Sequence, residues 1–421
     1  MRRGRYAVLL AALLLGGLAS PAYALLPGDL DTTFSKDGKA VTNLTTGYDV
    51  AGGIAAQADG RIVAAGMAGG KGGRFAVVRY KSDGRLDPTF SIDGKVFTNF
   101  TPGLDAAFDM ALDANENIVA VGRAGGGGGR FALVRYLPTG ARDPSFGRGD
   151  GIVLTNFTKK DDFAFGVAIQ GDGKIVAVGR AAGSGGVMAL ARYKQNGTID
   201  ATFGGGDGKL TTNFTRGDDR ADAVAVQADD AIVVAGTANY FGLNGKFALA
   251  RYTAAGALDP NFSGDGRVTS NFTPGFDGGF AVAVQTDQYI VAAGLAGSDL
   301  GLARYSPTGT LDETFSDDGK QTTSFTRRAD YADDIVIDPA GKIVVAGAAR
   351  FYGPNSMFAL ARYGSDGKLD TGFGGGDGKV TTDFTTGYDG AYGVALAPDS
   401  KIVAGGYAGG GRFAVARYIG G

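Results

Sequence analysis

Few kinds of side chain in this sequence are able to carry chemistry, because its 421 residues include no histidine, cysteine or tryptophan. Without an imidazole there is no Ser-His-Asp hydrolysis and none of the usual histidine-rich metal sites. Without a thiol there is no cysteine nucleophile, no disulfide and no thiolate ligand for a metal. Catalysis would have to use paired carboxylates, Ser, Tyr or Lys, together with oxygen-ligated Ca²⁺.

Carboxylates are plentiful, and 41 of the 43 acidic residues are aspartates, since Glu116 and Glu313 are the only glutamates. Many precede a glycine, as in Asp207-Gly208 and Asp377-Gly378. Each such pair offers one or two carboxylates, fewer than the six to eight oxygens that Ca²⁺ takes. Asp-Gly is also a preferred pair in tight turns. We interpret these pairs as turns and expect no metal and no cofactor, while the sequence leaves Ca²⁺ binding at the turns open.

The most regular feature is an Arg-Tyr pair that closes a short apolar run seven times. Successive tyrosines lie 53–59 residues apart, so nearly the whole chain is one tandem array. In such an array each unit buries its apolar face on its neighbours. The pairs are Arg79-Tyr80, Arg135-Tyr136, Arg192-Tyr193, Arg251-Tyr252, Arg304-Tyr305, Arg362-Tyr363 and Arg417-Tyr418.

The repeated arginine needs a partner for its charge if its strand is buried between units. The aspartate of the Leu-Asp-x-x-Phe motif that follows is the natural candidate, and we predict structural ion pairs. A ring of arginines that binds a ligand is the alternative, but recurrence in every unit favours structure. The predicted pairs are Arg79 with Asp87, Arg135 with Asp143, Arg192 with Asp200, Arg251 with Asp259, Arg304 with Asp312, and Arg362 with Asp370.

The loops that differ among the units are the better place to look for function. Two of them carry aromatic pairs where most units have glycines, and a neighbouring loop carries two arginines and an aspartate. Exposed aromatics beside charged groups suit a sugar or peptide ligand, so we predict a shallow ligand site there. The alternative is that these loops pack on one another. The predicted site residues are Tyr240, Phe241, Phe351, Tyr352, Arg327, Arg328 and Asp330.

The elements that position these residues are strands. In residues 105–157, four apolar runs of a few residues each alternate with segments rich in Gly, Asp and Asn, and no stretch after residue 24 keeps a helical period. Four antiparallel strands per unit and seven units predict an all-β fold, a seven-bladed β-propeller. A β-solenoid is the alternative, but its coils would be shorter and would not need two tight hairpins per unit.

The phase of the repeat predicts how the ring closes. Residues 38–44 correspond to the fourth strand of a unit, and the chain ends just after a third strand at Tyr418. We therefore expect the N-terminal strand to pair with the C-terminal blade, which removes an open sheet edge.

Residues 1–24 predict a secretory signal peptide. They hold three arginines within the first five residues, an apolar stretch over residues 7–18 and the small-x-small site Ala22-Tyr23-Ala24. An uncleaved anchor and a twin-arginine export signal are the alternatives. We expect residues 25–421 to form a single propeller that is secreted, periplasmic or at the cell surface, with no membrane span after removal of the signal.

The charge of the remaining chain bears on its partners. The predicted signal holds three of the 41 basic residues, so the rest carries a net charge of about −5. No basic stripe is present, which argues against a nucleic-acid partner.

The repeated motifs resemble those of the delta-60 repeat family of bacterial exported proteins. Residues 369–373 (Leu-Asp-Thr-Gly-Phe), 377–382 (Asp-Gly-Lys-Val-Thr-Thr) and 358–363 (Phe-Ala-Leu-Ala-Arg-Tyr) carry the resemblance, which extends over all of residues 25–421. It implies a β-propeller. It implies no catalytic residues, because repeats rather than one activity define the family. The departures are small: Arg142 and Ile199 replace the leucine of Leu-Asp, and residues 300–302 read Leu-Gly-Leu instead of Phe-Ala-Leu.

Three classes of function follow from the sequence. We expect a non-catalytic binding or surface-interaction scaffold for a glycan, a cell-wall component or a protein, because a rigid repeat array presents loops and the catalytic residue types are few. A carboxylate-dependent hydrolase or lyase and a structural envelope component are the alternatives.

Overall fold

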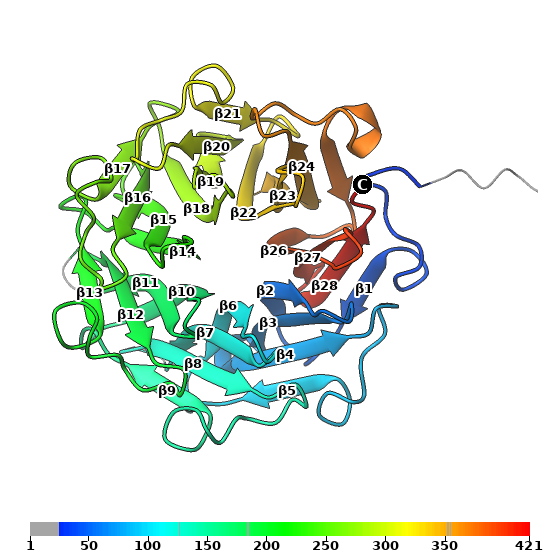
Figure 1. Ribbon diagram of the computed structural model, residues 1–421. Coiled ribbons are helices and arrows are strands. Elements are labelled where there is room, and N and C mark those ends of the chain that lie inside the picture. Colours follow the sequence, from blue (N-terminus) through cyan, green and yellow to red (C-terminus); the bar gives the residue numbers. More distant parts are fainter. Residues whose placement is uncertain (1–24, 126, 183–184, 352, 354) are drawn as a thin grey trace, which may run out of the picture.

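The computed structural model describes residues 25–125, 127–182, 185–351, 353 and 355–421. The predicted signal peptide and Tyr352 of the predicted site lie outside these residues. Seven sheets, each of four antiparallel strands, stand side by side in a closed ring (Figure 1). The predicted all-β, seven-bladed β-propeller is confirmed.

Within each blade the strands follow one another outward from the centre of the ring. The innermost strands are β2 (Val50–Ala56), β6 (Ala106–Leu112), β10 (Asp162–Ile169), β14 (Arg220–Val226), β18 (Asp277–Val284), β22 (Ala329–Ile337) and β26 (Gly390–Leu396). The second strands are β3 (Ile62–Ala68), β7 (Ile118–Ala124), β11 (Ile175–Ala181), β15 (Ile232–Ala238), β19 (Ile290–Ala296), β23 (Ile343–Phe351) and β27 (Ile402–Ala408).

The third and fourth strands complete each sheet. The third strands are β4 (Arg74–Tyr80), β8 (Arg130–Tyr136), β12 (Val187–Tyr193), β16 (Lys246–Tyr252), β20 (Asp299–Tyr305), β24 (Met357–Tyr363) and β28 (Arg412–Tyr418). The outermost are β5 (Lys95–Thr98), β9 (Ile152–Thr155), β13 (Lys209–Thr212), β17 (Arg267–Ser270), β21 (Lys320–Thr323), β25 (Lys379–Thr382) and β1 (Lys39–Thr42). We number the blades 1 to 7 from β2 to β26.

Helical structure in the described residues consists of two 3₁₀ turns, η1 (Gly70–Gly72) and η2 (Gly374–Gly376). In the same part of the chain, the structure has no helix of the length and hydrophobicity needed to cross a bilayer.

The second and third strands are almost entirely buried, because each blade lies flat between two others. Every core cluster joins two neighbouring blades; one of them packs Val176 and Leu190 of blade 3 against Ile232 and Ala250 of blade 4. Burial on both faces is why these strands read as continuous apolar runs and do not alternate with polar residues.

The repeated arginine links each blade to the next one. The Nε atom of Arg192 donates to Asp200 Oδ2 at 2.9 Å, and its guanidinium lies 4.5 Å from the centre of the Phe203 ring. Its Nη1 donates to the carbonyl of Ala254 in blade 4. All six predicted Arg-Asp pairs are in contact, at 2.7–2.9 Å. A seventh pair, Arg417 with Asp31 at 2.8 Å, completes the set.

The tyrosine that follows each arginine links its blade to the preceding one. The Tyr193 hydroxyl donates to Thr155 Oγ1 on the outermost strand of blade 2, at 2.7 Å. Burial raises the pKa of the Tyr193 hydroxyl well above its usual value, so it stays protonated as a donor. Adjacent residues on a strand point to opposite faces, which explains why one Arg-Tyr pair reaches both neighbours.

Blade 7 is built from both ends of the chain. β1 pairs with β28, with Lys39 opposite Ala416 and Thr42 opposite Phe413. The two ends of the chain also reproduce the turn that precedes the outermost strand in other blades. Ile419 N donates to Asp29 O at 2.9 Å, and the equivalent bond in blade 6 runs from Gly364 N to Lys368 O. The prediction that the N-terminal strand pairs with the C-terminal blade is therefore confirmed.

Removing residues 25–45 should destabilise the whole ring, because blade 7 then loses β1 and leaves Arg417 without Asp31. We expect the shortened protein to melt far below the full chain, in one transition measured by circular dichroism.

A rearranged variant is the matched control for that deletion. When residues 28–45 follow Gly421 directly, five residues separate Tyr418 from Leu30, the same number that separates the bridged residues Tyr363 and Leu369. This variant should recover most of the lost stability. A shortened protein that melts like the full chain would show that the closing strand is dispensable.

The Arg192→Met substitution should cost about 3–5 kcal/mol, since it leaves the buried Asp200 carboxylate with only the more distant Lys174, whose Nζ lies 4.0 Å away. Replacing Asp200 with asparagine as well should restore much of the loss. Urea denaturation of the single and double variants measures both values, and a loss under about 1 kcal/mol for the single change would mean that the pair is weak.

Candidate functional site

Each innermost strand contains a β-bulge at the same position, where one extra residue interrupts the pairing with the second strand. A bulge re-aims the side chain of the extra residue. The bulged residues are Gly52, Phe108, Phe165, Asp222, Phe280, Asp333 and Tyr392.

A glycine on the second strand makes room for each bulge. A Cβ at Gly236 would lie 1.9 Å from the carbonyl oxygen of Arg220, and the equivalent glycines of the other blades show 1.8–2.0 Å. No side chain fits at this distance. The bulge therefore requires a glycine at this position of the second strand. These glycines are Gly66, Gly122, Gly179, Gly236, Gly294, Gly347 and Gly406.

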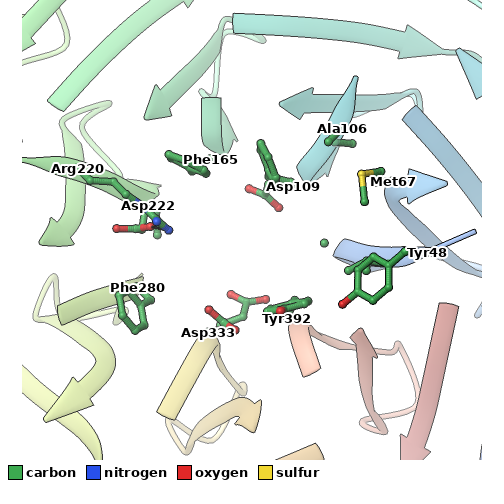
Figure 2. Close-up of a pocket in the computed structure, with 16 residues that line it drawn as sticks. Tyr48, Met67, Ala106, Asp109, Phe165, Arg220, Asp222, Phe280, Asp333 and Tyr392 are labelled. Carbon is green, nitrogen blue, oxygen red and sulfur yellow. Dashed lines mark ion pairs between the residues drawn. The ribbon is translucent and has the colours of Figure 1, made fainter. Parts of the chain in front are cut away.

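All seven bulged residues line one cavity of about 450 Å³ at the centre of the ring (Figure 2). It lies towards the face that carries the β1–β2 loop, because Tyr48 of that loop is part of its wall. We call this cavity the funnel. Phe108 and Phe165 contact each other on one side, with ring centres 5.2 Å apart. The funnel is the place where one side chain from every blade converges.

Arg220 and Asp222 of β14 form an ion pair in the funnel wall. The Arg220 guanidinium lies over two rings, 4.2 Å from the centre of Phe165 and 4.5 Å from that of Tyr240. Burial opposes the charge of Arg220, but the Asp222 carboxylate nearby raises its pKa overall. Burial also raises the pKa of Asp222, to about 6, although Arg220 acts in the opposite direction. The Oδ2 atom of Asp222 has no hydrogen-bond partner among the described residues.

Asp333 of β22 faces the same cavity without a cation of its own. Burial raises its pKa to about 8, and the nearby Asp222 and Asp334 carboxylates act in the same direction. A hydrogen bond with the Tyr331 hydroxyl and the charge of Arg220 oppose the rise. Its Oδ2 atom, like that of Asp222, is buried and has no hydrogen-bond partner in the described part of the chain. Asp333 is therefore the acidic group of the funnel that the protein satisfies least.

Asp109 and Asp334 follow the bulges of blades 2 and 6 and have a structural role as well. Asp109 accepts hydrogen bonds from Met110 N at 2.7 Å and from Val167 N of blade 3 at 2.9 Å. Asp334 accepts from Ile335 N at 2.8 Å and from Val394 N of blade 7 at 2.7 Å. Burial raises the pKa of Asp109 to about 6 and that of Asp334 to about 7. These carboxyls connect neighbouring innermost strands and add acidity to the funnel.

Tyrosines form the wall between blades 6 and 7. Tyr392 stacks on Tyr407 with ring centres 5.4 Å apart and hydrogen bonds connect Tyr331, Tyr392 and Tyr407. Burial raises the pKa of Tyr407 to about 12, with the neighbouring Tyr48 acting in the same direction. These hydroxyls are neutral hydrogen-bonding groups at ordinary pH.

Three of the predicted aromatic residues, Tyr240, Phe241 and Phe351, belong to the described part of the chain and are not among the residues that line the funnel. Tyr240 covers Arg220 and contacts Phe241, with ring centres 4.9 Å apart. Phe241 is 71% exposed and lies 5.5 Å from the Arg180 guanidinium. Phe351 packs against Tyr331, with ring centres 4.6 Å apart. Tyr240 and Phe351 thus support residues at or beside the funnel.

The charged residues of the predicted site divide into two kinds. Arg327 and Arg328 are exposed in the loop between β21 and β22. Asp330 was predicted as a residue of a shallow ligand site, but it is fully buried, and its oxygens accept from Phe325 N, Thr326 N and Arg350 N at 2.8–2.9 Å. An aspartate makes the same contacts in other blades, as Asp219 does. Its role is to hold the loop.

Sequence reasoning missed the bulged residues because it compared loops and not strands. The signal was present: at this one position of the first strand the residues are Gly, Phe, Phe, Asp, Phe, Asp and Tyr in chain order, whereas the second and third strands keep nearly the same residues in every unit. Within the described residues, no three acidic side chains are placed so as to hold a metal ion.

The chain matches a family model described as a domain of unknown function (DUF5122) beta-propeller. Six segments match, one in each of blades 1 to 6: residues 57–90, 116–146, 170–203, 227–262, 285–315 and 339–373. They contain the second and third strands and the Arg-Asp pair of each blade, and leave out the innermost strands. The match therefore describes the repeated frame and not the ring of bulged residues. Among curated proteins, a search found no match.

Several solved propellers have a similar overall shape. Virginiamycin B lyase from Staphylococcus aureus superposes with a TM-score of 0.57 at 11% identity, covering 90% of this chain and 99% of that one. A streptogramin B lyase gives 0.56 at 12% identity, over 90% and 97%. A catalytically inactive histidine-to-alanine variant of the S. aureus enzyme with quinupristin gives 0.56 at 10%, over 90% and 99%. Likeness at such identity shows a shared fold alone.

Asp333→Asn should stabilise the protein increasingly as the pH rises from about 4 to about 8. The pKa of Asp333 is near 8 in the folded state and 3.8 when unperturbed, so between these values the unfolded state has released a proton that the folded state still holds, and stability falls as the pH rises. Asparagine removes that loss. Melting temperatures across this range test it, with Asp93→Asn, 62% exposed in an outer turn, as the charge-matched control. A gain that does not change with pH would mean that Asp333 is hydrated.

Proposed function

We propose that this chain, a β-propeller repeat protein, is a non-catalytic binding protein of the delta-60 repeat type that receives its ligand in the funnel. The ligand is a small molecule or the projecting end of a glycan, a cell-wall component or a protein. The arginines, tyrosines and glycines that build the ring serve as its scaffold. The predicted signal peptide supports an exported location, in the periplasm, at the cell surface or outside the cell.

One observation carries the proposal: the blades share one frame, yet they differ at the position where all seven meet in a cavity. The frame repeats its Arg-Asp pair in all seven blades, whereas the bulged residues include glycine, phenylalanine, aspartate and tyrosine. A purely structural ring would have no need for this asymmetry. Different side chains around one shared cavity are what the recognition of an asymmetric ligand requires.

The chemistry of the funnel suits recognition. Its volume of about 450 Å³ falls in the range of small-molecule sites, which are mostly apolar with a few placed polar groups. Phe108, Phe165 and Phe280 supply apolar faces, and Asp222 and Asp333 each have one oxygen that accepts no hydrogen bond from the described residues. A sugar ring or another compact polar molecule would find both kinds of contact.

The absence of histidine argues against assigning to this chain the activity of the lyases that share its fold. One of those structures is a histidine-to-alanine variant described as catalytically inactive, and this chain contains no histidine at all. A chain that contains no imidazole and no thiol has few means of general acid–base catalysis.

A carboxylate-dependent hydrolase or lyase is the second candidate, and a specific observation favours it. Asp333 and Asp334 have pKa values raised to about 8 and about 7, in a cavity that also holds Tyr392. Carboxyls with such values are able to give up or take a proton near neutral pH. Release of product during the binding experiments below would support this candidate.

A screen of glycans and cell-wall fragments would identify a ligand. We expect Phe280→Ala to weaken the affinity for that ligand by about tenfold or more, because the substitution removes an apolar part of the wall. Calorimetry on residues 25–421 measures the affinity, and the melting temperature should change little because Phe280 lines open space. Ile92→Ala, 89% exposed on an outer turn, is the control.

The outer loops are the competing location for the same ligand. If Phe241→Ala abolishes binding and Phe280→Ala does not, the site lies on the loops and not in the funnel. If no compound binds and the two variants behave alike, the proposal of a binding function is wrong.

A further inference from the structure

We infer that the group recognised in the funnel is an organic cation, a protonated amine or a quaternary ammonium held between the rings of the funnel and the carboxylates of Asp222 and Asp333. This inference rests on the proposed function, because it names the ligand class of the same cavity. Four aspartates and a single arginine line the funnel. The cavity is thus acidic, and its one cation is already paired.

The first argument is that the acidic groups lack protein cations. Asp222 shares one oxygen with Arg220, and no Lys or Arg of the described chain forms an ion pair with Asp109, Asp333 or Asp334. Buried carboxylates are normally paired or fully hydrogen-bonded, because removal from water is costly. A ligand that brings a positive charge would supply the missing partner.

The second argument is the position of the two oxygen atoms without partners. Asp222 is only 8% exposed, yet its Oδ2 accepts no hydrogen bond from the described residues, and the same holds for Oδ2 of Asp333. They come from blades 4 and 6, on either side of Phe280 in blade 5, and both side chains lie at the cavity (Figure 2). A cation seated at Phe280 would therefore have an acidic oxygen on each side.

Aromatic faces supply the third argument. Aromatic rings attract cations through their negative faces. Arg220 shows this within the molecule, because its guanidinium lies 4.2 Å from the Phe165 ring centre and is paired with Asp222. Over the described residues, no Lys or Arg covers Phe108, Phe280 or Tyr392, although all three line the funnel. The funnel thus combines aromatic rings with a carboxylate, as the surroundings of Arg220 do, but no Lys or Arg of the described residues lies over these rings.

Binding of a cation should be tighter at higher pH. Burial raises the pKa of Asp333 to about 8, so near neutrality it holds a proton that a bound cation would displace. The ionisable groups that face Asp333 are Arg220 and Asp222 from β14, Tyr392 from β26, Tyr407 from β27, and Tyr331 and Asp334 from its own strand. Of these, only Arg220 is positive, and Asp222 already neutralises it.

Calorimetry with matched probes tests the inference on residues 25–421. Choline, cadaverine and glucosamine represent a quaternary ammonium, a free amine and an amino sugar, and 3,3-dimethylbutanol, pentanediol and N-acetylglucosamine are their neutral counterparts. We expect at least one cation to bind about tenfold or more tightly than its counterpart at about pH 7. Choline and cadaverine keep their charge up to about pH 8.5, and a preferred cation of these two should bind about tenfold more tightly there than at about pH 6. The cation that is preferred most strongly over its neutral counterpart shows whether the funnel binds a quaternary ammonium, a free amine or an amino sugar.

Asp333→Asn should remove most of this preference for the cation, whereas Asp93→Asn should keep it. Melting curves show that both variants are folded. Equal binding of cations and neutral counterparts, unchanged binding by Asp333→Asn, or no binding of any cation at millimolar concentration would each overturn the inference. A neutral ligand that is lost in Phe280→Ala would in that case still support the proposed binding function, so the two failures are distinguishable.

Discussion

The buried Arg-Tyr pair on the third strand of every blade is the interaction on which the ring depends. Because neighbouring side chains on a strand point to opposite faces, Arg192 reaches forward to the Ala254 carbonyl of blade 4 and Tyr193 reaches back to Thr155 of blade 2. A buried guanidinium is tolerated only with its charge paired and its donors satisfied. Asp200 and the carbonyl of the next blade meet that demand together, so a blade is complete only in contact with the following one.

Closure follows from the same requirement. In a ring every blade has two neighbours, and the arginine of the last blade must find a carbonyl in the first. Arg417 does so by donating to Ser82, while its carboxylate partner, Asp31, comes from the other end of the chain. The N-terminal segment therefore contributes more than the edge strand β1 to blade 7, because Asp31, which precedes β1, is the acid that allows the seventh arginine to be buried. A linear array of the same units would leave one such group unsatisfied at its end.

The β-bulge of the innermost strand separates the scaffold from the site. Gly236, the second-strand glycine of blade 4, has no side chain and so leaves room for the carbonyl group of Arg220. The extra residue of the bulge turns towards the centre, and the packing between blades is unchanged. Asp222 and Phe280 are consequently free to differ without disturbing the frame. The unpartnered oxygens of Asp222 and Asp333 lie in this ring, which agrees with the general finding that unsatisfied polar groups gather at functional sites.

Local sequence patterns determined the number of blades, their strands and the Arg192–Asp200 type of contact, because all of these depend on residues within one repeat of the chain. They also determined that Lys39–Thr42 would complete blade 7, since the phase of the repeat records which strand is missing. Tertiary structure alone decided that Asp330 is buried at the start of β22 and that Asp222, Phe280 and Asp333 share a cavity. These three residues lie in different repeats, and their proximity arises only when seven sheets curve into a ring. The physical reason is that hydrophobic periodicity reports which face of a strand is buried, whereas the contents of a central cavity depend on how separate blades converge.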